Sequence, residues 1–307
     1  MGQRMLKNMM RYPGFQPVAL WDPDEAARAS AHELYPDLPV SQSANVAILE
    51  SGAIATYIAC PPAFHHEYAN TAFDNGQAVF CEKPLGVDVE TSRQLTARAN
   101  DSGLVNIVNY TLASAPAATE LEHQYRTGQL GEIVGVDLRL HFSQWPEDWQ
   151  VDAANWLDYP EQGGFVREVV SHWIFLTQRL FGETNLVDSW LRYPATKTSE
   201  THVHAALRAS DIPVTVAGSV GGRGPDLFEY TVWGTRASAR ILDWGHLEMS
   251  DGNAWNKMLS EIQNPRETGY ERQLVNAAKA VSGSSHSMPN FQDALSVQLL
   301  VEALLNG

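Results

Sequence analysis

The residues of this chain that best suit chemistry lie in two short stretches. Glu82-Lys83-Pro84 places an acid, a base and a proline directly after an apolar run, and Glu168 and His172 stand four residues apart in a segment with a helical pattern. Residues at this spacing share one helix face, so the carboxylate can orient the imidazole. A histidine titrates near neutrality, a desolvated lysine can be shifted toward it, and a lysine cation can stabilise a developing alkoxide. The two stretches therefore predict proton exchange with a substrate hydroxyl group.

Both basic residues also have a purely structural interpretation. Lys83 can be a solvated charge that pairs with Glu82, and His172 can be a hydrogen-bonded histidine on the expected helix Phe165 to Phe181. Lys83 alone leaves the two interpretations open, and His172 alone favours the structural one. The two residues together favour the catalytic one.

Two apolar runs indicate where the first stretch lies. Ala53 to Cys60 closes with Pro61 and Pro62 before a helical segment that starts near Phe64, and Gln77 to Cys81 closes with Glu82 and Lys83. Apolar strands separated by helical patterns predict a parallel sheet covered on both faces. Ligands of such sheets bind at the carboxyl ends of the strands. We therefore expect a cofactor site formed by residues that follow these strands: Cys60, Pro61, Pro62, His65, Glu82 and Lys83.

The surrounding elements continue the alternation of strand and helix up to about residue 108. The expected elements are a helix from Met1 to Tyr12, a strand from Gln16 to Leu20, a helix from Glu25 to Glu33 capped by Asp24, a helix from Thr91 to Asn100 and a strand from Leu104 to Val108. This order predicts an α/β Rossmann domain. We place it at residues 1–107.

The pattern changes after Pro116, where strands follow one another with few helices between them. The expected strands are Glu132 to Phe142, Val187 to Arg192, His202 to Ala209, Val214 to Val220, Phe228 to Gly234 and Ala239 to Leu242. The expected helices are Thr119 to Arg126, Phe165 to Phe181, Tyr270 to Val281 and Phe291 to Leu305. This order predicts an α+β domain with a large open, mostly antiparallel sheet at residues 108–307.

The expected dinucleotide-binding domain lacks its beginning. The fingerprint G-x-G-x-x-G follows a first strand and opens the first helix, and only Gly2, at the place of the third glycine, is present. We therefore expect the first strand to be missing and NAD to bind weakly to the chain as written. Asp22 stands where an acid bonds the adenosine ribose, which favours NAD over NADP. Asp22 can also form an Asp-Pro turn at a helix start, and the two interpretations are not exclusive.

The order of several motifs resembles the glucose–fructose oxidoreductase and inositol dehydrogenase family, also written Gfo/Idh/MocA. The resemblance covers essentially the whole chain and rests on these segments: Ala59-Cys-Pro-Pro-Ala-Phe-His65, Cys81-Glu-Lys-Pro-Leu85, Thr127-Gly-Gln-Leu-Gly-Glu-Ile133, Gly163-Gly-Phe-Val-Arg-Glu-Val-Val-Ser-His172, Glu229-Tyr-Thr-Val-Trp-Gly-Thr235 and Pro289-Asn-Phe-Gln-Asp-Ala-Leu295.

This resemblance implies an NAD- or NADP-dependent enzyme that oxidises a hydroxyl, or reduces a carbonyl, of a sugar, polyol or similar small molecule. It implies that Lys83 hydrogen-bonds the reacting hydroxyl, that His172 accepts its proton and that Pro84 follows a cis peptide. It also implies a homo-oligomer formed through the sheet of the second domain. NAD-dependent glycosidase chemistry and a non-catalytic regulator that binds nucleotide and ligand remain alternatives within the same fold.

Three positions depart from the family pattern. Glu168 stands where aspartate is usual, Val170 stands where a glycine is common, and the stretch Thr111 to Pro116 lacks an arginine that the family often carries. The longer side chain weakens the argument for a direct catalytic role of Glu168. The missing cation argues against a carboxylate or phosphate substrate, so we expect a neutral one.

Composition and charge limit which partners and which cellular compartment we expect. The chain has 307 residues, of which 44% are hydrophobic and 19% charged, and its net charge is −15. This charge argues against nucleic acid or an anionic membrane surface as a partner. The two cysteines lie in apolar runs, and neither a signal peptide nor an apolar stretch of membrane-spanning length is evident. We expect a cytoplasmic protein.

The remaining histidines and tryptophans give weaker signals. His65-His66-Glu67 and the pair His202 and His204 lack cysteine partners and diagnostic spacing, so we expect no metal. Trp149 and Trp156 could stack on a sugar ring, although packing explains tryptophans in this region more simply. Both stay candidate substrate residues.

Overall fold

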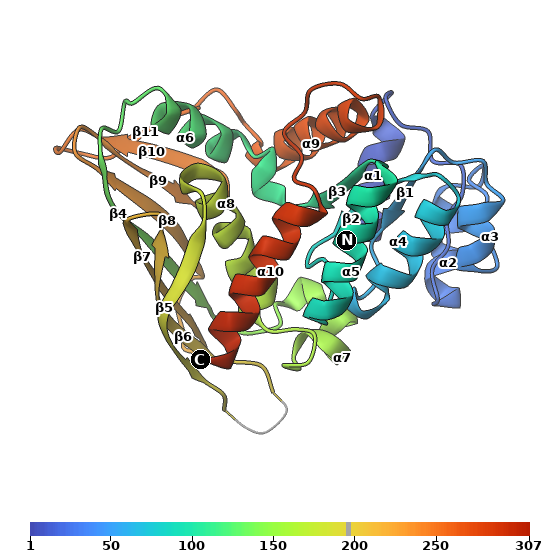
Figure 1. Cartoon of the computed structure of the whole chain (residues 1–307), viewed down its shortest axis with the longest axis horizontal. Coiled ribbons are helices and arrows are strands. Elements are labelled where there is room, and N and C mark those ends of the chain that lie inside the picture. The colour runs from blue at the N-terminus through green and yellow to red at the C-terminus, as the bar shows by residue number, and fades with distance from the viewer. Residues whose placement is uncertain (195–197) are drawn as a thin grey trace. The chain divides into compact units, whose positions relative to one another are not determined.

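The computed structural model describes residues 1–194 and 198–307, with residues 151–155 described by their backbone alone (Figure 1). Contacts divide the chain into two compact units. The first combines Met1–Tyr110 with Tyr270–Leu295, and the second combines Thr111–Gly269 with Ser296–Gly307. The sequence analysis placed a single boundary between residues 107 and 108, so it did not foresee that a later segment joins the first unit.

The first unit contains the predicted parallel sheet. Strands β1 (Ala55–Ile58), β2 (Ala78–Glu82) and β3 (Asn106–Asn109) pair in the order β1-β2-β3, and β2 is buried along its whole length. The five helices of the amino-terminal part are α1 (Gly2–Arg11), α2 (Glu25–Leu34), α3 (Ala44–Leu49), α4 (His65–Asp74) and α5 (Val89–Ser102). The sequence analysis missed only α3 among them.

Local capping explains where these helices begin and end. The Asp24 carboxylate accepts from the Ala26 N–H, as predicted, and Asp88 caps α5 in the same way through the Thr91 N–H at 2.7 Å. Gly103, in the left-handed conformation with φ 65°, ends α5.

The predicted strand Gln16 to Leu20 is wrong. This segment makes one isolated parallel bridge, in which Leu20 pairs with Val40. The Leu20 N–H bonds the Pro39 carbonyl, and the Ser41 N–H bonds the Leu20 carbonyl. Pro17 and Pro39 have no N–H to donate, so the ladder cannot extend far past this bridge.

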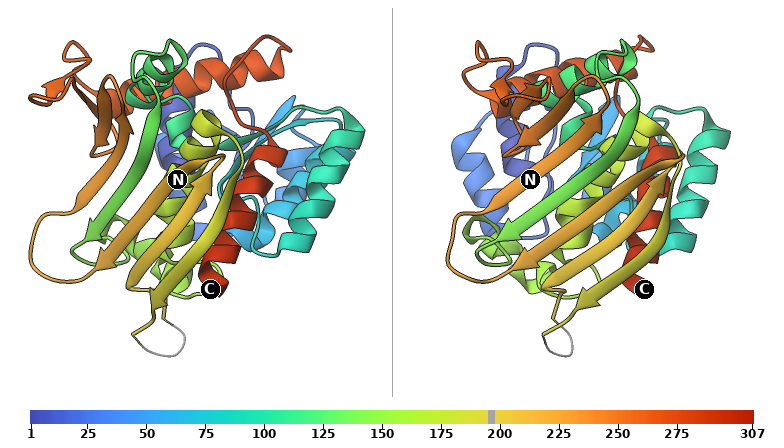
Figure 2. Two further views of the ribbon diagram at one scale, coloured as in Figure 1. Left: turned by 60° about the vertical axis from the view of Figure 1, so that its left-hand side comes forward. Right: turned by 90° about the vertical axis from the view of Figure 1, so that its left-hand side faces the viewer.

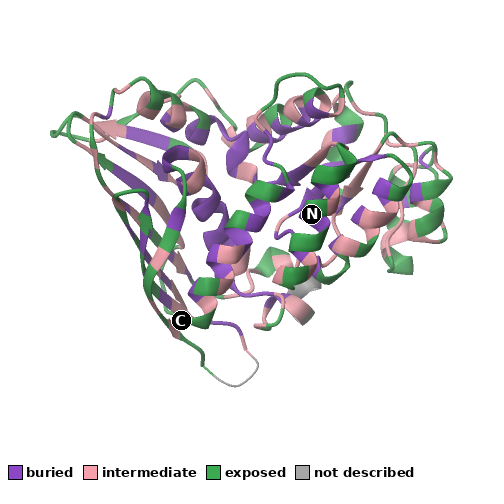
Figure 3. Cartoon of the chain, in the orientation of Figure 1, coloured by how far each residue is buried: buried purple, intermediate pink, exposed green. Residues whose placement is uncertain are grey.

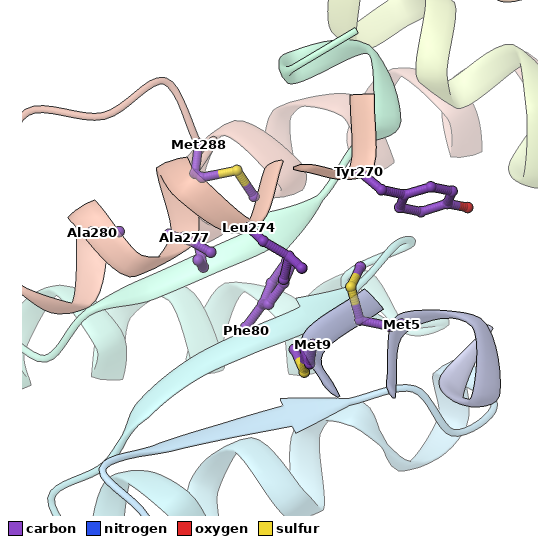
Figure 4. Packing of buried hydrophobic residues seen from close by; sticks show 9 residues of the cluster. Met5, Met9, Phe80, Tyr270, Leu274, Ala277, Ala280 and Met288 are labelled. Carbon is purple, nitrogen blue, oxygen red and sulfur yellow. The ribbon is translucent and has the colours of Figure 1, made fainter. Parts of the chain in front are cut away.

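The returning segment completes the core of the first unit (Figure 4). Helix α9 (Pro265–Val281) and the residues after it contribute apolar side chains that pack against α1, β2 and β3. The cluster consists of Met5, Met9, Phe80, Ile107, Tyr270, Leu274, Ala277, Ala280 and Met288. Burial of this apolar surface explains why Tyr270–Leu295 belongs to the first unit.

The second unit contains an eight-stranded open sheet, seen face-on in the right-hand view of Figure 2. Its order is β11-β10-β9-β8-β4-β7-β6-β5, and all neighbours are antiparallel except β4 and β7. The strands are β4 (Ile133–Phe142), β5 (Thr184–Arg192), β6 (His202–Ala209), β7 (Ile212–Val220), β8 (Leu227–Gly234), β9 (Ser238–Leu242), β10 (His246–Ser250) and β11 (Asn256–Lys257). The predicted mostly antiparallel sheet is confirmed, and the short β10 and β11 were missed.

Helices cover one face of this sheet. α6 (Pro116–Arg126) contacts β9 and β10, and α8 (Ser171–Phe181) contacts β5 and β6. α8 is buried along almost its whole length (Figure 3). The short α7 (Ala154–Leu157) precedes it, and α10 (Phe291–Asn306) crosses the division between the units. None of the described helices combines the length and the hydropathy that crossing a bilayer requires.

Candidate active site

The first unit brings the predicted strand-end residues together. β1 and β2 are parallel neighbours, with Ile58 opposite Cys81, so the loops that follow them emerge at one edge of the sheet. The His65 ring lies between these loops: Nε2 is 2.9 Å from the Cys60 carbonyl oxygen and Nδ1 is 2.9 Å from the Pro84 carbonyl oxygen. One imidazole therefore joins the Cys60 loop to the Glu-Lys-Pro loop.

His65 is fully buried in this position. Burial is the main cause that lowers its pKa, and the Lys83 charge acts in the same direction. Both ring nitrogens contact backbone oxygens, so the structure supports a role in fixing the two loops. The sequence analysis assigned His65 to the cofactor site, and that assignment stays a prediction.

Glu82 is held inside the first unit by a chain of hydrogen bonds. Its Oε1 accepts from the Tyr57 hydroxyl and, at 2.7 Å, from Asn109 Nδ2, and Gln273 of α9 donates to Asn109 Oδ1. Burial raises the pKa of Glu82, and the bonds from Tyr57 and Asn109 oppose that shift. Glu82 Oε1 is thus held within the unit by two hydrogen bonds.

Lys83 lies between these two anchors. Its neighbour Glu82 is fixed by the Tyr57–Asn109–Gln273 chain, and the carbonyl of its other neighbour, Pro84, contacts His65. The Lys83–Pro84 peptide is cis, as the resemblance implied, and the Lys83 side chain is half-buried. The residues on both sides of the lysine are therefore held by hydrogen bonds, Glu82 through its side chain and Pro84 through its backbone carbonyl.

The start of α1 lies beside the same edge of the sheet. A Cβ added to Gly2 would stand 3.7 Å from the Ala59 Cβ, so this residue approaches the end of β1 closely. The cap residue of α1, Met1, makes no side-chain hydrogen bond to the first turn of the helix. Gly2, predicted to belong to the cofactor site, therefore lies beside the loop that carries Pro61 and Pro62.

Asp22 and Cys60 have different surroundings. The Asp22 carboxylate accepts from the Asp24 N–H at 2.9 Å, and its backbone carbonyl accepts from Arg28. The turn interpretation of Asp22 is confirmed, and a half-buried carboxylate at this turn is compatible with a ribose contact. Burial raises the pKa of Cys60 to about 12, so its thiol stays protonated and unreactive at neutral pH.

The second unit carries Glu168 and His172 on an irregular helix start. Residues Val166–Val170 form a π-helical turn that runs directly into α8, where the sequence predicted one regular helix. The Glu168 N–H bonds the Gly164 carbonyl at 3.0 Å, and the Ser171 hydroxyl bonds the Arg167 carbonyl at 2.6 Å. π-Turns within helices occur often at functional sites. Glu168 is half-buried and His172 buried.

Sequence reasoning missed Trp244, which contacts His172 directly. The two rings meet edge to face, with centroids 5.3 Å apart, and the indole also packs on Trp173 and Phe228. Trp244 and its neighbour Asp243 have φ values of 67° and 47° in the turn between β9 and β10. Non-glycine residues rarely adopt this conformation, and it marks functional sites when the surrounding structure holds it. A lone tryptophan between two short strands gave no signal in the sequence.

The other candidates are placed as follows. Trp149 is 56% exposed and Trp156 is half-buried, both in the segment between β4 and α8. His66 contacts Asn70, while His202 and His204 lie on β6 beside Thr201 and Trp190. In the part of the chain that the structure describes, no three His, Cys, Asp or Glu side chains gather as metal ligands would.

Comparisons with known proteins agree with this geometry. Residues 1–110 match the profile of an oxidoreductase family with an NAD-binding Rossmann fold, and residues 119–240 match the GFO/IDH/MocA C-terminal domain. A levoglucosan dehydrogenase from Pseudarthrobacter phenanthrenivorans is 26% identical over 173 residues, which span 55% of this chain and 42% of that protein.

Solved structures share the fold over nearly the whole chain. GenD2 from gentamicin A biosynthesis, in complex with NAD, has a TM-score of 0.80 at 19% identity and covers 100% of this chain and 90% of its own. KijD10, a 3-ketoreductase from Actinomadura kijaniata in complex with NADP and TDP-benzene, has a TM-score of 0.81 at 17% identity and covers 99% and 93%. The chain therefore belongs to the GFO/IDH/MocA family of oxidoreductases, whose first domain is an NAD-binding Rossmann fold.

Proposed function

We propose that this protein is an NAD(P)-dependent oxidoreductase that oxidises a hydroxyl, or reduces a carbonyl, of a neutral sugar, polyol or similar small molecule. The observation that carries the proposal is the fixed position of Lys83, between two buried anchors at the carboxyl edge of the parallel sheet. A flexible surface lysine would need no such support. A lysine that must meet a reacting oxygen within hydrogen-bond distance does need it.

Each polar residue has a defined task in this proposal. Lys83 donates a hydrogen bond to the substrate oxygen and stabilises negative charge that develops on it. His172 accepts the hydroxyl proton, and Glu168, one helical turn earlier, orients the imidazole. Trp244 contacts the same imidazole edge to face. The bound nicotinamide supplies the hydride acceptor, and Gly2, Asp22, Pro61 and Pro62 hold the dinucleotide.

The residues at the place where the family often carries an arginine fit a neutral substrate. The stretch Thr111–Ala113 forms a 3-10 turn without any charged side chain, followed by Ser114, Ala115 and Pro116. A carboxylate or phosphate substrate would need a cation to offset its desolvation. The relative named levoglucosan dehydrogenase supports the same substrate class.

We also propose NAD as the preferred cofactor, because the Asp22 carboxylate would repel a 2′-phosphate. Similar structures contain NAD in one case and NADP in the other. Calorimetric titration with each cofactor, for the wild type and for Asp22→Asn, tests this choice. Asp22→Asn should bind NADP more tightly than the wild type does, so that its preference for NAD is reduced. A wild type that binds NADP more tightly than NAD would contradict the role of Asp22.

Activity is tested with a panel of neutral polyols, sugars and anhydrosugars, with NAD(P)H absorbance as the readout. The expected result is turnover of at least one neutral compound that His172→Ala abolishes while cofactor binding persists. Cofactor and ligand binding without turnover across the panel would favour the regulator alternative. Release of an aglycone from glycosides without net NADH formation would favour the glycosidase alternative.

We propose in addition that the sheet of the second unit forms a homo-oligomer interface. Val134, Val187, Trp190 and Trp233 are large apolar side chains on its strands that are each more than a third exposed. Light scattering after chromatography should show a species larger than the 33.9 kDa chain. A monomer at micromolar concentration would contradict this assignment.

A further inference from the structure

Glu200 is a buried acid that neither the sequence motifs nor the proposed reaction accounts for. It follows the segment after β5 and is 1% exposed, and its Oε1 accepts from the Val166 N–H at 2.7 Å. Its second oxygen, Oε2, has no hydrogen-bond partner among residues 1–194 and 198–307. A buried carboxylate aimed at one backbone N–H, 34 residues away in the chain, is a costly arrangement that calls for a specific role.

The two glycines of the Gly163-Gly164 motif make room for this arrangement. A Cβ on Gly164 would lie 2.4 Å from Glu200 Oε2 and 2.6 Å from Oε1, and Gly164 has a φ of +94°. A Cβ on Gly163 would lie 2.2 Å from the Leu157 carbonyl oxygen. Close approach of the backbone to the Glu200 carboxylate thus requires glycine at position 164.

The N–H that donates to the Glu200 carboxylate belongs to Val166, the first residue of the π-turn. Val166 starts the segment that includes Glu168 and continues without a break into α8 and His172. The first N–H groups of a helix have no partner within the helix, and Val166 is fully buried, so water cannot replace the carboxylate. We propose that Glu200 is a positioning residue for His172, because it caps the turn that sets the direction of Glu168 and His172. This inference rests on the proposed function, in which His172 accepts the substrate proton.

Charged groups of both signs lie around Glu200. Arg167 attracts the carboxylate, and Glu302 and Tyr193 are the other titratable groups near it. Arg167 itself forms a two-bond pair with Glu302, at 2.7 and 2.8 Å, and donates to the Pro160 and Gly163 carbonyls. Burial raises the pKa of Glu200 to about 7, so the cap changes its charge near neutral pH.

Hydrogen–deuterium exchange followed by mass spectrometry tests the cap without reference to activity. Glu200→Ala should speed exchange of the peptide that spans residues 164–176 by roughly tenfold, the scale set by loss of a buried helix cap. Glu200→Gln keeps an acceptor oxygen and should exchange no faster than the wild type. Gly164→Ala should resemble Glu200→Ala, because the added Cβ displaces the carboxylate. Glu161→Ala, which removes an exposed acid of the preceding loop, is the matched control and should change nothing.

Activity of the same variants tests whether the cap matters for His172. Glu200→Ala should lower kcat by roughly tenfold while the Kd for NAD stays unchanged, and Glu200→Gln should restore most of the rate. Unchanged exchange in Glu200→Ala overturns the cap, and faster exchange with full kcat overturns its link to His172. Full turnover of His172→Ala would instead contradict the proposed function and with it the positioning role, while the exchange data would still decide whether Glu200 caps the turn.

Discussion

His172 and Trp244 meet edge to face, with ring centroids 5.3 Å apart and ring planes at 88°. The contact joins α8 to the turn between β9 and β10 within the second unit. It restricts rotation of the imidazole about its last side-chain bond, which decides the direction in which each ring nitrogen faces. Trp244 itself packs on Trp173 and Phe228, so these two aromatic residues hold the indole against His172.

The first prediction concerns this contact. Trp244→Ala should lower kcat/KM by roughly tenfold, because an aromatic pair contributes about 1 kcal/mol beyond its buried area and the imidazole loses its flank. Trp244→Phe should retain most of the activity. Steady-state kinetics with the substrate identified from the neutral panel measure the effect, and Trp255→Ala is the control, since Trp255 packs on Trp233 and Arg240 elsewhere in this unit. Equal losses in Trp244→Ala and Trp255→Ala would indicate a general folding defect.

A second prediction separates the chemical roles. Lys83→Ala and His172→Ala should each lower kcat by about 10² or more, the scale of a positioned acid–base group. Glu168→Gln should lie between the wild type and His172→Ala. The double variant of Glu168→Gln with His172→Ala should be no slower than His172→Ala, because residues that act as a unit are not additive. Additive losses would show that Glu168 acts on the substrate independently of the imidazole.

Stability should depend on pH through Glu200. Its folded pKa of about 7 lies above the ordinary value of 4.5, so the folded state binds the proton more tightly. The stabilising effect of that proton is complete below about pH 4.5 and is lost as the pH rises through 7. As the pH rises from 5 to 8, the free energy of unfolding of Glu200→Gln should therefore increase by about 2 kcal/mol relative to that of the wild type.

Urea unfolding of both proteins at several pH values measures this difference. The matched control is Glu302→Gln, which alters the charge around Arg167 but leaves the Val166 N–H its acceptor. A difference between Glu200→Gln and the wild type that stays constant from pH 5 to pH 8 would rule out a titrating, buried Glu200.

The anchor of Lys83 gives a fourth prediction. Asn109→Ala removes the link between Glu82 and Gln273, which are both buried, and should destabilise the fold by about 2 to 3 kcal/mol. It should also lower kcat more than it changes the Kd for NAD, because Lys83 loses its fixed backbone. Thermal unfolding and kinetics check the two effects.

Asn70→Ala is the comparison for this anchor. Asn70 bonds the half-exposed Arg98 and His66 on the helices outside the sheet, so its loss should cost less than about 1 kcal/mol. If Asn109→Ala destabilises the fold no more than Asn70→Ala does, the hydrogen bonds that link Glu82, Asn109 and Gln273 do not hold Lys83.

Much of the local structure was predictable from the sequence. Asp24 before α2 and Gly103 after α5 act through bonds within a few residues, so their types alone fix the helix ends. The alternation in β6, whose predicted bounds are confirmed, follows from one buried and one exposed sheet face. The apolar run into β2 likewise placed Glu82 and Lys83 at a strand end, and the motif order indicated the family.

Only the tertiary structure shows which of these residues are held by buried hydrogen bonds. His65 and Glu82 carry the polar groups expected of a cofactor site, yet both are engaged by Cys60, Pro84, Tyr57 and Asn109, which parallel strand pairing brings to them. Glu200 reaches Val166, and the turn holding Trp244 reaches His172, across long separations in the chain. No periodicity encodes such contacts, because they depend on how whole elements pack. The return of α9 to the first unit has the same cause: its apolar side chains pack against α1, β2 and β3, which come from distant parts of the chain.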